Sequence, residues 1–269
     1  NRDAQKISHH LLKTNKLIDL SGDFRLRNTN HYLKWYKKKH LSKKNISQSI
    51  YILPELNNTN VKNYNIISCP GCYPTSILLP LVPILKKKLI KTSNIVIDSK
   101  SGYSGAGRVF YNKFKNRNIK NSLSVYGVKN HKHNPEIQQE FVKHLNRKIK
   151  FNFTPHLIPM FRGILTSIYV DLDNKSSVSK VIKCLKIFYK NSKFVDIVKE
   201  NTLLSTISVI NTNNCKISVC EISNKKLLIL STIDNLIKGG AGQAVQNFNK
   251  IYNFNEYEGL NNLWKKKLI

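Results

Sequence analysis

The sequence predicts an α/β protein whose later part is built around an antiparallel sheet. Two short apolar segments, residues 16–24 (KLIDLSGDF) and 64–68 (YNIIS), have the form of buried strands. The first of them ends in polar side chains, and in open α/β sheets ligands bind at such strand ends. Later segments alternate or run apolar like antiparallel strands: 151–158, 162–172, 215–223 and 226–234, with the last two joined by a turn at 224–226.

A buried helix is predicted directly after the second strand. Residues 74–89 are apolar almost all round, so this helix should be enclosed by the core, and Pro80 and Pro83 should bend it. Residues 93–108 then read as a strand that runs into a loop rich in glycine and serine. The order strand, helix, strand is that of an α/β unit.

Three more helices are predicted farther along the chain. In residues 133–145, Asn134 has the position of a cap and Pro135 that of the first helical residue. Residues 176–191 have helical spacing, and an amphipathic helix should follow within 234–252.

The net charge of the chain suggests a polyanionic binding partner, but the distribution of the lysines argues against a specific one. Among 269 residues, 45 are Lys or Arg and 15 are Asp or Glu, which gives a net charge of +30. The lysines occur in short groups throughout, and Lys, Asn and Ile are abundant together, as an AT-rich genome would produce. We therefore expect no specific nucleic-acid partner, although non-specific binding at low salt fits the charge. No apolar stretch approaches the ~20 residues that span a membrane, so we expect a cytoplasmic protein without a membrane partner.

The five cysteines do not form a disulfide framework or a zinc site. Only Cys69 and Cys72 are close in sequence, and no second pair with this spacing exists to complete four zinc ligands. We therefore expect no bound metal. Thioredoxin-like exchange fits the spacing C-P-G-C, but such motifs begin a compact βαβ domain, which this chain does not resemble.

Cys72 stands where a Pro-Gly turn enters the predicted helix. Unpaired backbone N–H groups and the positive end of the helix dipole favour a thiolate at that place. Cys69 lies before the turn, at the end of a strand, without that field. The alternative reading is that both are ordinary buried cysteines.

Two histidines offer a base for such a nucleophile. His131 and His133 stand just ahead of the predicted cap Asn134, and imidazole titrates near neutral pH. The loop 101–107 (SGYSGAG) offers backbone N–H groups to a phosphate. Arg25, Arg108 and Arg162 each lie beside one of the predicted loop segments, and guanidinium groups suit carboxylate or phosphate binding.

Six motifs in this order resemble one family closely. They are IDLSGDFRL, PGCYPT, SGYSGAGR, HKHNPEI, FTPHLIPMFRGIL and DNLIKGGAGQAVQN. Together they are similar to N-acetyl-gamma-glutamyl-phosphate reductase, the NADP-dependent enzyme of arginine biosynthesis. The resemblance covers the chain from about Asp3 onward.

This resemblance implies a Rossmann part and an α+β catalytic domain of the glyceraldehyde-phosphate and aspartate-semialdehyde dehydrogenase type. On that pattern, residues 1–71 are the C-terminal remainder of a dinucleotide-binding domain and residues 72–237 form the catalytic and dimerisation domain. Residues 238–269 hold a helix that returns to the cofactor domain. The family also implies a homo-oligomer, a dimer or a tetramer.

The family chemistry is the reduction of N-acetyl-gamma-glutamyl phosphate by NADPH. Cys72 matches the family nucleophile, which forms a thioester as phosphate leaves. We favour His131 over His133 as the acid–base group and assign His133 to substrate binding. By analogy Arg25 holds the phosphoryl group, and Arg162 is the candidate for the substrate carboxylate. The expected cofactor contacts are Ser101, Gly102, Gly105 and Asn235.

One family feature is missing from this sequence. The family begins with a glycine-rich strand-turn-helix that holds the cofactor pyrophosphate, and no such motif is present here. The chain is therefore expected to lack the first part of the Rossmann domain. An inactive or incomplete remnant remains an alternative, and aspartate-semialdehyde dehydrogenase and a basic nucleic-acid-binding protein are less favoured.

The two cysteines should differ in function, because only Cys72 has the turn-to-helix position. In the enzyme with its complete cofactor domain, Cys72→Ser should abolish reductive dephosphorylation, whereas Cys69→Ser should leave most of it. Steady-state assays of both variants check this expectation. Comparable losses from the two substitutions would instead support the dithiol reading.

Overall fold

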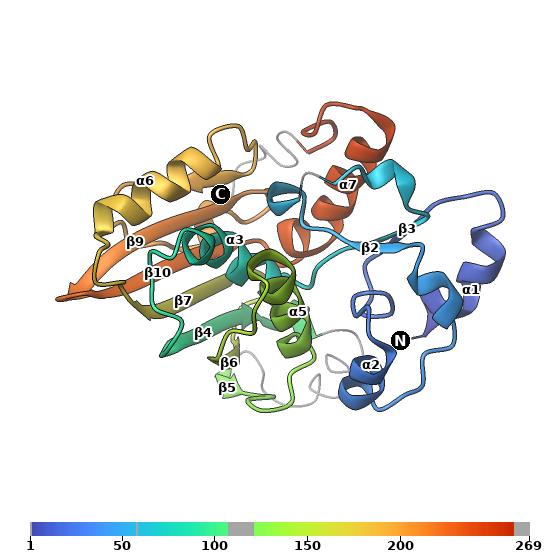
Figure 1. The fold of residues 1–269 in the computed structure, drawn as a ribbon, viewed down its shortest axis with the longest axis horizontal. Coiled ribbons are helices and arrows are strands. Elements are labelled where there is room, and N and C mark those ends of the chain that lie inside the picture. The colour runs from blue at the N-terminus through green and yellow to red at the C-terminus, as the bar shows by residue number, and fades with distance from the viewer. Residues whose placement is uncertain (1, 58, 107–120, 261–269) are drawn as a thin grey trace.

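The computed structural model describes residues 2–57, 59–106 and 121–260, and within them the chain forms two sheets (Figure 1). The smaller sheet has three parallel strands in the order β1-β3-β2, and the larger has seven strands in the order β5-β6-β4-β7-β10-β9-β8. This arrangement bears out the predicted class, an α/β part joined to a second part with a large sheet.

The small sheet contains both strands that the sequence predicts near its beginning. Its strands are β1 (Leu17–Asp19), β2 (Ser49–Tyr51) and β3 (Ile66–Ser68). Strand β2 was not predicted, because three residues are too few to show a period. Helices α1 (Asp3–Leu11) and α2 (Thr29–Tyr36) lie in the same part of the chain.

The large sheet is mixed, which corrects the prediction of an antiparallel sheet. Its strands are β4 (Ile95–Gly102), β5 (Ser124–Val125), β6 (Phe151–Ile158), β7 (Ile164–Asp171), β8 (Val195–Ile197), β9 (Cys215–Ser223) and β10 (Lys226–Ile233). Strands β7, β10 and β9 are antiparallel as predicted, and the turn before Lys226 joins β9 to β10. Strand β6, however, runs parallel to β4. The reason is that a helix lies between these two strands in the sequence, and such a crossover returns the chain in the same direction.

Helix α3 (Cys72–Lys86) lies at the centre of the core. It begins at Cys72, two residues before the predicted start, and packs on β7 and β10. Pro80 and Pro83 lie inside this one helix. Pro83 has no N–H to donate to the carbonyl of Leu79, and the hydroxyl of Tyr189 donates to that carbonyl instead, at 2.6 Å. A tertiary contact thus supplies the hydrogen bond that proline removes.

The other predicted helices are present as well. Helix α5 (Asn134–Leu145) packs against α3, and α6 (Val178–Phe188) packs on α3 and β9. The predicted cap of α5 is wrong, because Asn134 lies within the helix and its buried Oδ1 has no hydrogen-bond partner in the described structure. The cap of α6 is Ser177, whose side chain accepts a hydrogen bond from the Lys180 amide.

Helix α7 (Gly242–Tyr252) follows a π-helical turn, Ile237–Ala241, which is interrupted by a kink at Gly240. Helix α7 lies beside the small sheet (Figure 1). Its Ile251 joins the apolar cluster of that sheet, which includes Ile50 and Ile67. The end of the chain's described part therefore packs against its beginning. No helix in the described residues is both long and apolar enough to cross a membrane.

A buried ion pair ties the π-helical turn to the segment after β2. Lys238 and Glu55 form this pair, and their side chains are 0% and 2% exposed. Gln246 of α7 accepts from Lys238 at 2.8 Å and donates to Glu55 at 2.8 Å. Burial would raise the pKa of Glu55, but Lys238 and the hydrogen bonds hold it below its ordinary value. The network therefore keeps a charged carboxylate in the interior.

We expect Lys238→Met to destabilise the protein by about 3–5 kcal/mol at pH 7, because it leaves Glu55 buried and unpaired. Without Lys238, burial raises the pKa of Glu55, so the variant should lose stability as pH rises and recover part of it at pH 5. Urea unfolding followed by circular dichroism at both pH values measures this difference. The exposed lysine Lys186 of α6 provides the control, since Lys186→Met should leave the urea midpoint of unfolding unchanged.

Candidate active site

Cys72 is the first residue of α3 and follows Gly71, whose backbone is extended. The carbonyl of Gly71 accepts hydrogen bonds from the amide and the hydroxyl of Thr75, both at 3.0 Å, which closes the first helical turn. A Cβ on Gly71 would lie 2.2 Å from Nε2 of His133, and one on Gly239 would lie 2.6 Å from Cβ of Cys72. Glycine at these positions lets His133 approach the turn before Cys72 and lets the π-helical turn approach Cys72 itself.

The electrostatics of Cys72 differ from the sequence-based expectation. Burial raises the pKa of its thiol to about 11, while Arg25 and backbone hydrogen bonds from Tyr73 and Cys72 act in the opposite direction. The field of the helix end is thus present but weaker than desolvation. Burial also raises the pKa of Cys69 to about 12. The thiol of Cys72 is protonated at neutral pH in this structure.

The two histidines lie side by side, with ring centroids 4.7 Å apart. His131 packs edge-on against Tyr73, Tyr126 and Phe153. Its Nδ1 accepts a hydrogen bond from the amide of His133 at 3.2 Å. In the neutral ring the proton therefore lies on Nε2, which is a donor.

His133 lies against Gly71, in the turn before Cys72. Its Nε2 lies 3.4 Å from Nη1 of Arg25 and 4.0 Å from a carboxylate oxygen of Glu136. Because the guanidinium only donates, this nitrogen is the acceptor. Sequence reasoning favoured His131 as the acid–base group and assigned His133 to substrate binding.

Both imidazoles are neutral at physiological pH. Burial, followed by the charge of Lys132, lowers the pKa of His131 to about 4. Burial, His131 and Arg25 lower the pKa of His133 well below its ordinary value. The expectation of titration near neutrality is therefore corrected, because the rings lie out of water.

Arg25 is held in place by backbone carbonyls. Its Nε donates to the carbonyl of Cys69 at 2.9 Å, and Nη2 donates to that of Leu20 at 2.8 Å. Its Nη1 lies 3.5 Å from Glu136. The structure thus brings Arg25, His133 and the turn before Cys72 together.

Glu136 is the residue of this cluster that sequence reasoning missed. Its side chain is 1% exposed, and Oε1 accepts hydrogen bonds from the amide of Gly71 at 2.6 Å and from the hydroxyl of Tyr51 at 2.7 Å. Burial raises the pKa of Glu136, whereas Arg25 and these two donors lower it. The sequence shows this residue only as an acid in the first turn of a helix. Its spacing of three from His133, which puts both on one helix face, was the available signal.

A second group of predicted residues gathers around the end of β4. Asn235 accepts from the amide of Gly163 at 2.6 Å and donates to the hydroxyl of Ser104 at 3.0 Å. A Cβ on Gly105 would lie 2.8 Å from Oγ of Ser101 and 3.4 Å from Nδ2 of Asn235. The structure therefore places Ser101, Gly105 and Asn235 together.

Gly102 and Arg162 belong to the same neighbourhood. A Cβ on Gly102 would lie 2.7 Å from the backbone nitrogen of Arg162. The guanidinium of Arg162 donates to Asn211 at 2.6 Å and to Asp234 at 3.3 Å. Its charge is thus partly balanced by a buried carboxylate. Arg108 lies outside the described residues.

The two groups adjoin each other at the π-helical turn. Gly239, which touches Cys72, follows Asn235 by four residues, and its amide donates to the carbonyl of Asp234 at 3.0 Å. Within the described residues no group of three or more His, Cys, Asp and Glu side chains is placed to hold a metal ion.

Comparison of this chain with known proteins identifies its family. Residues 72–235 match the family model of the semialdehyde dehydrogenase dimerisation domain. N-acetyl-gamma-glutamyl-phosphate reductase from Vesicomyosocius okutanii is 43% identical over 94% of this chain and 74% of its own length. This chain belongs to the N-acetyl-gamma-glutamyl-phosphate reductase family. Reductases of the same name from Desulforamulus reducens and Acinetobacter baumannii are 42% and 43% identical, each over 91% of this chain and 72% of their own length.

Solved structures place this reductase family member in the expected fold class. Aspartate semialdehyde dehydrogenase from Francisella tularensis superposes with a TM-score of 0.68 at 14% identity, over 94% of this chain and 79% of that one. Aspartate semialdehyde dehydrogenase II from Vibrio cholerae gives 0.60 at 18% identity, over 79% and 70%. At these identities the likeness concerns the fold alone, and it confirms the predicted class.

In this reductase family member, Glu136→Gln should make Cys72 more reactive and Arg25→Gln should make it less so. Glu136 raises the pKa of the thiol and Arg25 lowers it, so removing either charge moves the pKa in the opposite direction. Below its pKa the thiolate fraction rises about tenfold per pH unit. Alkylation of Cys72 by iodoacetamide from pH 8 to 10, followed by peptide mass spectrometry, measures the shift.

Glu221→Gln, which neutralises an exposed carboxylate on β9, is the matched control and should not change the alkylation rate. If Glu136→Gln slowed alkylation of Cys72, the carboxylate would be acting on the thiol through positioning and not through its charge.

Proposed function

We propose that this chain carries out the reductase chemistry of its family: reduction of N-acetyl-gamma-glutamyl phosphate by NADPH to N-acetyl-L-glutamate 5-semialdehyde and phosphate, in arginine biosynthesis. The observation that carries the proposal is the thiol of Cys72 at the start of α3, beside a buried arginine and a histidine pair. The names of relatives more than 40% identical over most of the chain support the same reaction.

The first proposed step is acyl transfer to Cys72. Its sulfur attacks the acyl carbon, the bond from that carbon to the phosphate oxygen breaks, and the bond electrons leave with the phosphate. The thiol is protonated at neutral pH because burial raises its pKa to about 11. Its proton therefore departs as well, and the leaving phosphate takes it up. The product of this step is a thioester on Cys72.

His131 and Arg25 are proposed to handle charge during this step. The protonated Nε2 of His131 donates to the substrate oxygen where negative charge develops. Arg25, fixed by two backbone carbonyls, holds the phosphoryl group, with His133 at its side. Arg162 remains the proposed partner of the substrate carboxylate.

The loop at the end of β4 is the proposed cofactor site. When bound, NADPH would supply the hydride for reduction of the thioester to the aldehyde, and a proton from water would restore the thiol of Cys72. The residues present fit a polar ligand: Gly105 is exposed, and within the described part of the chain one amide proton of Asn235 is left over after its bond to Ser104. Ser101 and Gly102 complete the proposed contacts.

We also propose that copies of this chain associate into a homo-oligomer. The family model matched by residues 72–235 is a dimerisation domain, which supports a homo-oligomer, either dimer or tetramer. The substrate, N-acetyl-gamma-glutamyl phosphate, is the proposed small-molecule partner.

The acyl-transfer step can be tested without NADPH. Incubation of the chain with N-acetyl-gamma-glutamyl phosphate should add one N-acetylglutamyl group to Cys72, seen by intact-protein and peptide mass spectrometry. Cys72→Ser should form no thioester. His131→Asn should slow acylation by ~10²–10⁴-fold with little change in the substrate concentration that gives half the maximal rate. His133→Asn should mainly raise that concentration.

His10→Asn changes an exposed histidine on α1 and serves as the control. A chain that is folded by circular dichroism but never acquires the adduct would contradict the proposed activity. A larger rate loss from His133→Asn than from His131→Asn would make His133 the acid–base group and His131 the substrate-binding residue. The proposed reaction would be unaffected by that result.

A further inference from the structure

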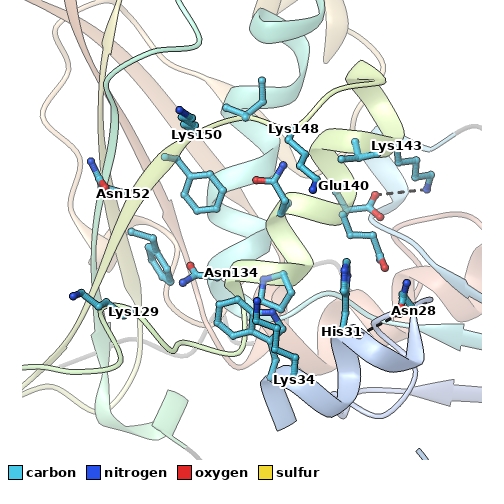
Figure 2. A pocket seen from close by; sticks show the side chains of 18 of the residues that line it. Asn28, His31, Lys34, Lys129, Asn134, Glu140, Lys143, Lys148, Lys150 and Asn152 are labelled. Carbon is cyan, nitrogen blue, oxygen red and sulfur yellow. Dashed lines mark hydrogen bonds and ion pairs between the residues drawn. The ribbon is translucent and has the colours of Figure 1, made fainter. Parts of the chain in front are cut away.

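A pocket of about 1000 Å³ lies between α2, α5 and β6, and none of the residues assigned to the reaction lines it (Figure 2). Helix α2 contributes His31, Lys34 and Trp35 to its wall. Exposed or partly exposed apolar groups from the other elements include Phe151 and Val142, and Val142 is 40% exposed. We call it the α2–β6 pocket.

The α2–β6 pocket faces the edge of β6, not one face of the sheet. Residues 150–154, which are consecutive in sequence, all line it. Successive side chains of a strand point to opposite faces, so a pocket over one face would be lined by every second residue only. A consecutive run is what an open strand edge presents.

Beyond the end of β5, backbone groups of β6 on that edge have no hydrogen-bond partner among the described residues. In the described residues, β5 pairs with β6 only at His156 and Leu157. The carbonyl of Pro155 accepts from the amide of Tyr126 at 3.2 Å, so it points to the same side as β5. Since backbone groups alternate sides along a strand, those of Phe151 and Phe153 point to this edge too, beyond the end of β5.

The charge around the pocket is strongly positive. The basic side chains that line it are Arg27, Lys34, Lys129, Lys143, Lys148 and Lys150, and Figure 2 shows labelled lysines on several sides of it. The acidic residue of the wall, Glu140, is already paired with Lys143 at 3.6 Å. The lysine-lined pocket therefore favours an acidic partner over a second copy of this chain, which has 45 basic and 15 acidic residues.

We propose that the α2–β6 pocket binds an extended acidic segment of another protein, which adds to β6 as a new strand. Main-chain hydrogen bonds to the edge would supply affinity, and the apolar and lysine-lined walls would select side chains. The proposal concerns a surface apart from Cys72 and does not depend on the reductase reaction.

Lysines beside an open strand edge also serve to prevent edge-to-edge pairing between copies. That protective role and the proposed binding site make different predictions. Protection alone requires no affinity for an acidic strand and no preference for particular backbone amides. Strand addition requires both, because only every second amide of the peptide faces β6.

The test is fluorescence polarisation of a short labelled peptide in which Glu and Val alternate, titrated with the 269-residue chain at physiological salt. Two further peptides carry N-methyl groups on every second amide, one set on odd positions and one on even positions. We expect saturable binding, loss of binding for one methylated peptide and unchanged binding for the other. A peptide with Lys in place of Glu should not bind.

The double variant Lys148→Glu, Lys150→Glu should bind the peptide about tenfold more weakly. Its matched control is Lys183→Glu, Lys186→Glu on α6, which has the same charge change on an exposed helix face far from the α2–β6 pocket in sequence. The proposal is overturned if the peptide does not bind, if both methylated peptides bind equally, or if the control variant loses as much affinity as the test variant.

Discussion

The buried carboxylate of Glu136 is the interaction on which the candidate site depends. It accepts hydrogen bonds from the hydroxyl of Tyr51 and the amide of Gly71, and it faces Arg25. These partners come from the small sheet, from the turn before α3 and from the loop after β1. A buried donor without its acceptor is costly, so each partner is confined to the place where the carboxylate lies. One side chain thus aligns three segments around Cys72.

The same burial that fixes the geometry also sets the charge of the site. Desolvation outweighs the field of the helix end, which leaves Cys72 protonated, and it keeps His131 and His133 neutral. The charges that remain next to the thiol belong to Arg25 and Glu136. In such a site the opposing effects of these two residues on the thiol decide how easily it becomes a thiolate.

A second buried network holds the other side of the thiol. The pair Lys238–Glu55, bridged by Gln246, fixes the π-helical turn, and Gly239 within that turn touches Cys72. Cys72 therefore lies between two polar networks, one formed around Glu136 and the other around the Lys238–Glu55 pair. Close packing on either side leaves no room for a Cβ at Gly71 or Gly239.

The sequence by itself determined the main strands and helices, the entry of Cys72 into α3, and the family, because these depend on local patterns and on motifs in a fixed order. Only the tertiary structure decided the parallel pairing of β6 with β4 and the function of Glu136, whose partners Gly71 and Tyr51 lie 65 and 85 residues away. It also decided the neutral state of the thiol and of both histidines. Desolvation and long-range hydrogen bonds depend on what packs around a group, and no local pattern carries that information.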